Sequence, residues 1–282
     1  MTETILTEEP FNFSKHSTIG CGGKAKKAYY PQGEKQFCSL LGQLSEKPLI
    51  LGNMSNVLPR DEDVDKTVIC TQKAATICQE DTYVYCEAGV TSGRLLRYLQ
   101  TVGLGGVEFL AGIPCTVGGI LYMNGGAGGR YIADFVDSVR VYRDGKVIDL
   151  PVAQCGYAYK QSLFMQSGDV ILGGKFRLDH STPTAINEEI SKWLLKRAHL
   201  PKGKSMGCVF KNPQGYTAGI LIERAGLKGL RIGGAVVSQQ HANFIINEQG
   251  ATAGDIRALI TRIKEEVWQR YAIRLEEEIR YL

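Results

Sequence analysis

Glycine is distributed unevenly along the chain, and its densest cluster is the first feature with a possible chemical role. Ten of the 33 glycines lie between Gly103 and Gly129, in a stretch that also holds Pro114 and Asn124. Glycine tolerates positive φ and lets backbone N–H groups come close to a ligand, which is how a protein without a basic cluster can hold a pyrophosphate. So many glycines also predict that the stretch contains no regular helix. We therefore expect an irregular, phosphate-binding segment here.

Two shorter glycine-containing segments precede this cluster. Thr18–Gly23 reads Thr-Ile-Gly-Cys-Gly-Gly, and Leu51–Asn56 reads Leu-Gly-Asn-Met-Ser-Asn. No segment carries the G-x-G-x-x-G fingerprint of a Rossmann fold, and no Walker A loop occurs. Each segment alone is typical of an ordinary turn. Together, their small residues and their Ser and Asn side chains could supply N–H and hydroxyl donors to a diphosphate.

The C-terminal part holds further segments of distinctive composition. They are Ser205–Pro213, Ala218–Gly229, Val237–Asn247, Ala251–Asp255 and Leu275–Arg280. In this order they resemble the substrate domain of the type II UDP-N-acetylenolpyruvoylglucosamine reductases, and the three glycine-rich segments resemble the FAD-binding domain of the family that includes vanillyl-alcohol oxidase. The resemblance covers residues 15–280.

The resemblance implies an α+β protein with two domains. A two-part FAD-binding domain of the vanillyl-alcohol-oxidase type would span residues 1–180, divided near residue 67, and a smaller α+β substrate domain would span 181–282. The implied enzyme uses NADPH and non-covalent FAD to reduce UDP-N-acetylglucosamine enolpyruvate to UDP-N-acetylmuramate. That reaction belongs to peptidoglycan precursor synthesis, and thus to cell-wall growth, cell shape and division.

The resemblance also implies the residues that would contact FAD. They are small, amide or hydroxyl residues of the glycine-rich segments: Gly20, Gly22, Gly23, Gly52, Asn53, Met54, Ser55, Asn56, Gly112, Pro114, Thr116, Gly118, Gly119, Asn124, Gly125, Ala127 and Gly128.

The implied reaction needs a cation for the charge that develops on the substrate carboxylate and an acid that protonates the α-carbon. In the family an arginine, a glutamate and a serine fill these roles. Glu278 matches the glutamate, whereas Lys160 stands at the arginine of a segment that normally reads C-x-F-G-Y-R-x-S, and Cys208 stands at the serine. Lysine keeps the charge but loses the two-pronged geometry of arginine. A thiol is a stronger acid than an alkyl hydroxyl, so Cys208 can donate a proton.

Three further residues are implied substrate contacts: Asn212, Lys211 and His241. A structural interpretation competes with each, because Asn-Pro is a common turn pair, surface lysines are usually solvated, and a lone histidine is often a structural hydrogen-bonding group. Glu278 is likewise one of three consecutive acids that a solvated strand end would explain.

Cysteine spacing and charge exclude several other classes. The eight cysteines form no C-x-x-C pair, so a zinc or iron–sulfur site is not expected, and those in apolar runs such as Val68–Cys70 and Tyr83–Glu87 should be buried, reduced thiols. The net charge of +4 is dispersed, which argues against a nucleic-acid partner. Without a long apolar run or a basic leader, we expect a cytoplasmic monomer that does not bind membranes.

Local periodicity predicts the elements that must position these residues. One helix is expected over residues 34–44, and a second is expected to end near Arg197. A third is expected to begin near Thr252, because apolar residues recur at helical spacing from there to Tyr271. Strands are expected at 48–51, 83–87, 138–142, 146–150 and 170–178, with Asp144-Gly145 as a hairpin turn.

Two other functions compete with the reductase. An oxidase on the same FAD scaffold would use oxygen as its acceptor, which the C-terminal segments argue against. A flavin-binding protein without catalysis would account for the substitutions at Lys160 and Cys208.

Overall fold

The computed structural model describes residues 4–282, which divide into two compact units. Unit 1 comprises the residues up to Glu9, Lys27–Asn53 and Lys66–Ala198, and unit 2 comprises Pro10–Lys26, Met54–Asp65 and His199–Leu282. These units are groups of residues that pack together, and they are not defined by the ligand that each part of the chain would bind. The functional boundaries expected from the sequence, 1–180 and 181–282, therefore stay a prediction.

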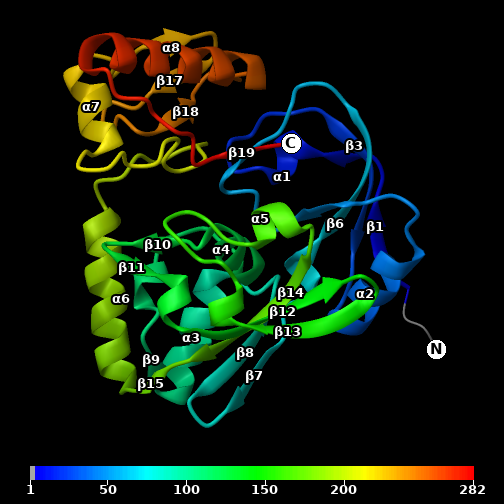
Figure 1. Ribbon diagram of the computed structural model, residues 1–282. Helices are drawn as coiled ribbons and strands as arrows, with labels where there is room; N and C mark the ends of the chain where they lie inside the picture. The colour runs from blue at the N-terminus through cyan, green and yellow to red at the C-terminus, as the bar shows by residue number, and fades with distance from the viewer. Residues whose placement is uncertain (1–3) are drawn as a thin grey trace. The chain divides into compact units, whose positions relative to one another are not determined.

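Unit 1 is built on a five-stranded antiparallel sheet (Figure 1). Its strands, in spatial order, are β13 (Lys146–Pro151), β12 (Val136–Arg143), β14 (Val170–Arg177), β8 (Tyr83–Glu87) and β7 (Ile77–Glu80). Four of these strands were expected from the sequence and are confirmed. Asp144 and Gly145 both have positive φ, 49° and 79°, as a two-residue type I′ hairpin turn requires.

A second sheet has the order β1-β3-β6-β4, and β2 pairs with the part of β3 that belongs to unit 2. Its strands are β1 (Leu6–Glu8), β2 (Phe11–Asn12), β3 (Lys24–Tyr30), β4 (Leu49–Leu51) and β6 (Val64–Cys70). Two short pairs complete unit 1: β9 (Leu104–Gly105) with β15 (Asp179–His180), and β10 (Gly126–Ala127) with β11 (Arg130–Tyr131).

The helices of unit 1 are α2 (Glu34–Gln43), α3 (Ser92–Val102), α4 (Val117–Met123), α5 (Phe164–Ser167) and α6 (Pro183–Arg197). Both α2 and α6 were expected. The core of the unit joins α3 and α4 to the five-stranded sheet, and Gly174 of β14 lets Leu121 of α4 approach so closely that an added Cβ would lie 2.8 Å from its Cδ1. Cys70 and Cys86 are 3% and 0% exposed, as the apolar runs predict.

The prediction that 103–129 contains no regular helix is wrong, because α4 lies inside this stretch. Thr116 caps the helix, since its Oγ1 accepts the N–H of Gly119 at 3.3 Å. The helix ends at Asn124, whose φ of 43° is left-handed. Two glycines are tolerated because they lie in the first turn, next to a strong N-cap.

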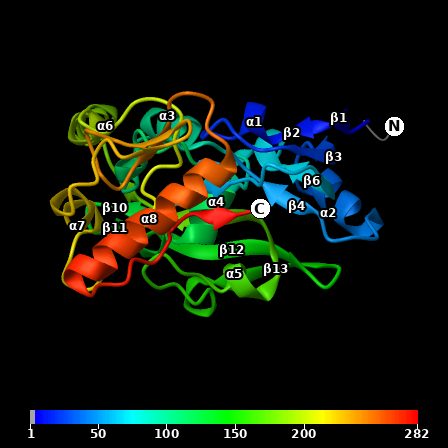
Figure 2. The same cartoon turned by 90° about the horizontal axis from the view of Figure 1, so that it is seen from above.

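Unit 2 combines a three-stranded antiparallel sheet with three helices. The sheet order is β16 (Arg231–Ile232), β17 (Ala235–Val237), β18 (Ile245–Asn247), and the helices are α1 (Phe13–His16), α7 (Ala218–Arg224) and α8 (Ala253–Tyr271). Helix α8 packs on β16 and β17 and beside α7 (Figures 1 and 2). Strands β5 (Val57–Leu58) and β19 (Arg280–Tyr281) pair in parallel.

Helix α8 shows the periodicity that the sequence predicts. Its buried face is apolar, and Thr252 and Asp255 form a capping box at its N-terminus. A second carboxylate, from Asp61, accepts the N–H groups of Ala253 and Gly254 at 2.7 and 2.9 Å. Asp61 thereby ties the 54–65 segment to the C-terminal segment of the chain.

Within residues 4–282, no helix is both long and apolar enough to span a bilayer. In the same range, no three His, Cys, Asp or Glu side chains gather where they could hold a metal ion.

Candidate active site

Two of the predicted cofactor segments meet in unit 1. The turn after β4 lies against the N-cap of α4, where a Cβ added to Gly52 would be only 2.3 Å from Thr116 Oγ1. Asn53 Nδ2 also donates to the carbonyl of Pro114 at 3.5 Å. The structure therefore brings Gly52 and Asn53 together with Pro114 and Thr116, and only glycine fits at position 52.

The first turn of α4 is bonded to the turn that follows β8. The N–H of Val117 donates to Val90 O, and the N–H of Gly118 donates to Ala88 O, both at 2.8 Å. A Cβ on Gly118 would lie 2.9 Å from that of Ala88. Glycine is therefore needed here for packing, and the predicted donation from Gly118 to FAD would require an internal bond to break.

The later glycines of this segment also face protein atoms. A Cβ on Gly112, Gly125 or Gly128 would meet Arg197, Ile120 or Trp193 at 3.0, 2.5 and 2.6 Å, respectively. Gly119 donates its N–H to the Thr116 cap, and Ala127 pairs with Arg130 in the β10–β11 hairpin. These contacts shape the segment, whatever the glycines do toward a ligand.

The remaining predicted cofactor residues cluster separately in unit 2. A Cβ on Gly20 would touch Lys204, one on Gly22 would touch Pro59, and one on Gly23 would lie 2.5 Å from the carbonyl oxygen of Asp61. The carbonyl of Met54 accepts from Thr18 Oγ1 at 3.5 Å, and Ser55 and Asn56 follow in the same segment. Asn56 Nδ2 donates to Glu278 O at 3.0 Å, a protein contact that the sequence did not predict.

The chemistry of these segments fits the diphosphate of FAD. Residues 51–56 and 112–128 contain no Asp or Glu, so no carboxylate repels an anionic group. Short polar residues lie among the glycines, and the close approach of Gly52 to Thr116 joins two such segments in unit 1. Neutral donors of this kind hold phosphates in proteins that lack a basic cluster.

Lys160 occupies a strained position in a tight turn. Ala158 and Gln161 exchange both backbone hydrogen bonds, at 3.2 and 3.1 Å, and Lys160 between them has φ = 54°. Positive φ at the third residue of a four-residue turn is the type II geometry, which favours glycine or asparagine there. A lysine in this place is therefore held by its surroundings against its own backbone preference.

The C-terminal end of α4 supplies part of that hold. Asn124 Nδ2 donates to Ala158 O at 2.8 Å, and its Oδ1 accepts from Ala133 N at 3.3 Å. Ser162 Oγ donates to Tyr122 O at 2.6 Å. The amide of Asn124 therefore braces the Lys160 turn, and its predicted contact with FAD stays a prediction.

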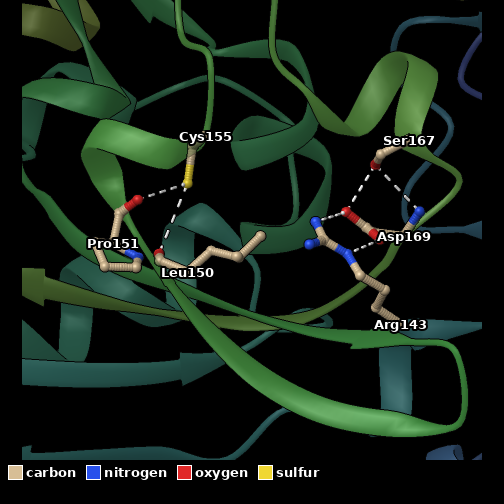
Figure 3. Close-up of polar contacts among 6 residues, drawn as sticks. All are labelled: Arg143, Leu150, Pro151, Cys155, Ser167 and Asp169. Carbon is tan, nitrogen blue, oxygen red and sulfur yellow. Dashed lines mark hydrogen bonds and ion pairs between the residues drawn. The ribbon is translucent and has the colours of Figure 1, made fainter.

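The segment that carries Lys160 is also fastened at both ends, as Figure 3 shows. Cys155 Sγ lies 3.7 Å from Leu150 O and 3.5 Å from Pro151 O, and burial raises the pKa of this thiol to about 11. At the other end, Asp169 accepts from Arg143 at 2.7 and 2.6 Å and from Ser167 Oγ at 2.7 Å. The Arg143 guanidinium holds the pKa of Asp169 below its usual value, so the pair stays ionised near neutral pH.

Cys208 and Glu278 lie on adjacent extended segments of unit 2, outside the regular strands. The N–H of Glu278 donates to Val209 O at 2.8 Å, and Cys208 itself bridges to Phe244. The backbones of these two predicted catalytic residues are therefore one register step apart. The structure brings them together, whereas Lys160 belongs to unit 1.

The three implied substrate residues each have protein partners. Asn212 Oδ1 accepts the N–H of Ala218 at 3.0 Å at the start of α7, and Lys211 forms an ion pair with Glu276. His241 Nδ1 accepts the N–H of Asn243 at 3.3 Å, and burial lowers the pKa of His241, which favours the neutral ring. These contacts match the structural interpretation of Asn212 and His241, whereas the Lys211 side chain is only 14% exposed and is not the solvated lysine of that interpretation. The substrate roles of all three stay predictions.

Two buried polar residues escaped the sequence analysis. Asn243 is 3% exposed and bonds to the backbone of Phe210. The signal was an asparagine inside the apolar run that ends at Ile246, where a buried amide must be hydrogen-bonded. The hydroxyl of Tyr157, at the phenylalanine position of the Lys160 segment, is buried and meets no hydrogen-bond partner within residues 4–282.

Comparison with known proteins places this arrangement in one family. Residues 194–282 match the C-terminal domain of UDP-N-acetylenolpyruvoylglucosamine reductase, and residues 29–151 match a FAD binding domain. The UDP-N-acetylenolpyruvoylglucosamine reductase of Geobacter metallireducens is 40% identical over 98% of this chain and 93% of its own length. The chain belongs to the UDP-N-acetylenolpyruvoylglucosamine reductase family.

Other members of the reductase family agree with this assignment. The reductase of Thermosipho melanesiensis is 36% identical over 94% of this chain and 91% of its own length. The crystal structure of the reductase from Thermus caldophilus superposes with a TM-score of 0.85 at 32% identity and covers 99% of both chains. The predicted α+β fold, with a FAD-binding part followed by a C-terminal domain, and the FAD cofactor are confirmed by these matches.

The strain at Lys160 leads to a stability prediction. Lys160→Gly should raise the free energy of unfolding by about 0.5–1 kcal/mol relative to Lys160→Met, because a side chain in the left-handed region costs more than the added chain entropy of glycine. Both variants lose the same charge, so their difference isolates the backbone. Urea denaturation of the two proteins measures it, and a methionine variant as stable as the glycine variant would contradict the strained turn.

Proposed function

We propose that this protein reduces UDP-N-acetylglucosamine enolpyruvate to UDP-N-acetylmuramate, with NADPH as the electron donor and FAD as the carrier. The observation that carries the proposal is the near full-length match to UDP-N-acetylenolpyruvoylglucosamine reductases, 40% identical over 98% of the chain, with both domain types present. The reaction supplies a peptidoglycan precursor, and through it serves cell-wall growth, cell shape and division. The proposed enzyme is a cytoplasmic monomer without nucleic-acid or membrane partners.

FAD, when bound, would carry a hydride from NADPH to the β-carbon of the enolpyruvyl ether, so that negative charge would develop on the α-carbon and its carboxylate. A cation must stabilise this charge, and Lys160 is the residue proposed to do so. The braced turn supports that role, because charge stabilisation depends on a donor already in place before the charge forms.

Cys208 is proposed to complete the reaction by protonating the α-carbon. Its S–H bond breaks, the proton forms the new C–H bond, and solvent reprotonates the thiolate. Glu278 is proposed as the third catalytic residue. The bond between Glu278 N and Val209 O supports a shared role, because it fixes the segment that carries Cys208 beside the one that carries Glu278.

Flavin absorbance in the two half-reactions tests the proposed function. NADPH alone should bleach the FAD-loaded enzyme, and UDP-N-acetylglucosamine enolpyruvate should restore the colour under anaerobic conditions. Parallel lines in double-reciprocal plots should accompany this behaviour, because each substrate reacts with a different form of the enzyme. Reoxidation by oxygen but not by the UDP-sugar would favour an oxidase, and FAD that NADPH does not bleach would favour a flavin-binding protein without catalysis.

The role of Cys208 is tested in the second half-reaction alone. Cys208→Ala should slow anaerobic reoxidation by the UDP-sugar by about a hundredfold, because general acid catalysis contributes on that order, and should leave reduction by NADPH intact. Cys208→Ser keeps a proton donor and should retain substantial reoxidation. Stopped-flow absorbance of the flavin measures both steps. An alanine variant as fast as the parent would remove Cys208 from the mechanism.

A further inference from the structure

We propose that Asn243 is a positioning residue for catalysis, which fixes the Cys208–Phe210 segment so that Cys208 keeps its place relative to Glu278. The inference rests on the proposed function, since Cys208 and Glu278 take their roles from it. It adds a residue that lies 35 positions from Cys208 in the sequence.

The side-chain amide of Asn243 forms hydrogen bonds through both its oxygen and its nitrogen to the Cys208–Phe210 segment. Its Oδ1 accepts the N–H of Phe210 at 2.9 Å, and its Nδ2 donates to Phe210 O at 2.8 Å. The backbone of Asn243 adds a third bond, because its carbonyl accepts the N–H of Val209 at 2.9 Å. A single residue therefore fixes two consecutive residues immediately after Cys208.

The Cys208–Phe210 segment is also bonded to Glu278. Val209 O accepts the N–H of Glu278 at 2.8 Å, and Asn56 Nδ2 holds the carbonyl of Glu278 at 3.0 Å. Val209 is thus held by Asn243 on one side and by Glu278 on the other. A shift of Asn243 would therefore displace Val209, and with it the backbone next to both Cys208 and Glu278.

An amide is needed because no regular sheet continues through this place. Cys208 pairs with Phe244 and Phe210 pairs with Glu277 only as isolated bridges. The Asn243 amide offers a donor and an acceptor in one plane, and so replaces the missing strand neighbour of Phe210. Phe210 is 1% exposed, so its backbone groups would otherwise be buried without a partner.

His241 orients Asn243 in turn. Its Nδ1 accepts the backbone N–H of Asn243 at 3.3 Å, which requires the neutral ring. A Cβ on Gly219 of α7 would lie 3.2 Å from His241 Cε1 and 3.7 Å from Asn243 Cβ, so the helix packs closely on both residues. The amide therefore has little freedom to turn away from Phe210.

A matched pair of variants tests the positioning role in the FAD-loaded enzyme. Asn243→Ala removes the two bonds to Phe210. Asn247→Ala is the control, because Asn247 is similarly buried in unit 2, at 6% exposure, but its side chain bonds to Ile19, Gly20 and Ala251 and not to the Cys208–Phe210 segment. The readout is the ratio of two rate constants, flavin reoxidation by the UDP-sugar over flavin reduction by NADPH. A general loss of structure does not change this ratio.

Asn243→Ala should lower the ratio by about tenfold to a hundredfold, as expected when a reacting group is displaced on the order of 1 Å. Asn247→Ala should lose stability in urea but keep the parent ratio. If Asn243→Ala does not fold, Asn243→Ser, which keeps one hydrogen-bonding group, should show a smaller fall in the same ratio. An unchanged ratio in the folded Asn243 variant, or an equal fall in the control, would overturn the inference.

A second readout separates this inference from the proposed function. The rate of Cys208 alkylation by iodoacetamide depends on the exposure and surroundings of the thiol, and it is measured without enzyme turnover. It should change several-fold in Asn243→Ala and match the parent in Asn247→Ala. If the parent enzyme is not reoxidised by the UDP-sugar, the proposed function fails, and the alkylation rates still decide whether Asn243 positions Cys208. Equal rates in both variants would overturn the inference.

Discussion

The hydrogen bonds at the two ends of α4 hold both functional segments of unit 1. At its start, the N–H groups of Val117 and Gly118 are bonded to the turn after β8, next to the contact of Gly52 with Thr116. At its end, Asn124 and Tyr122 hold the turn that carries Lys160. Seven residues of helix thus set the position of the predicted cofactor segment and of the predicted catalytic cation together.

Unit 2 depends on asparagine and aspartate side chains that connect distant parts of the sequence. Asp61 caps α8, Asn56 holds Glu278, and Asn247 holds Ile19. These bonds explain why residues 54–65 pack with the C-terminal segment, although the sequence places them inside the FAD-binding part. Small polar residues of the predicted cofactor segments therefore also connect distant parts of the fold, and Asn56 is the clearest example.

The sequence predicted the regular elements well, because periodicity and turn residues are local signals. Helix α8 and the Asp144-Gly145 hairpin follow directly from them. Helix α4 was missed because the high glycine content of the stretch argued against a helix, and composition alone does not reveal that Thr116 caps one. The family resemblance supplied the candidate residues, but their partners depend on tertiary contacts. Neither the brace that Asn124 forms nor the role of Asn243 can be read from spacing.

We expect FAD binding to depend on the close approach of Gly52 to Thr116. The most direct test is the dissociation constant of FAD for Gly52→Ala, measured by flavin fluorescence, with Gly93→Ala as the control. A Cβ on Gly52 would lie 2.3 Å from Thr116 Oγ1, whereas one on Gly93 meets only Arg97 at 3.6 Å. We expect the Gly52 variant to fold but to bind FAD at least about tenfold more weakly, because the two segments must separate, and we expect the control to bind like the parent. Unchanged FAD affinity in a folded Gly52→Ala protein would contradict it.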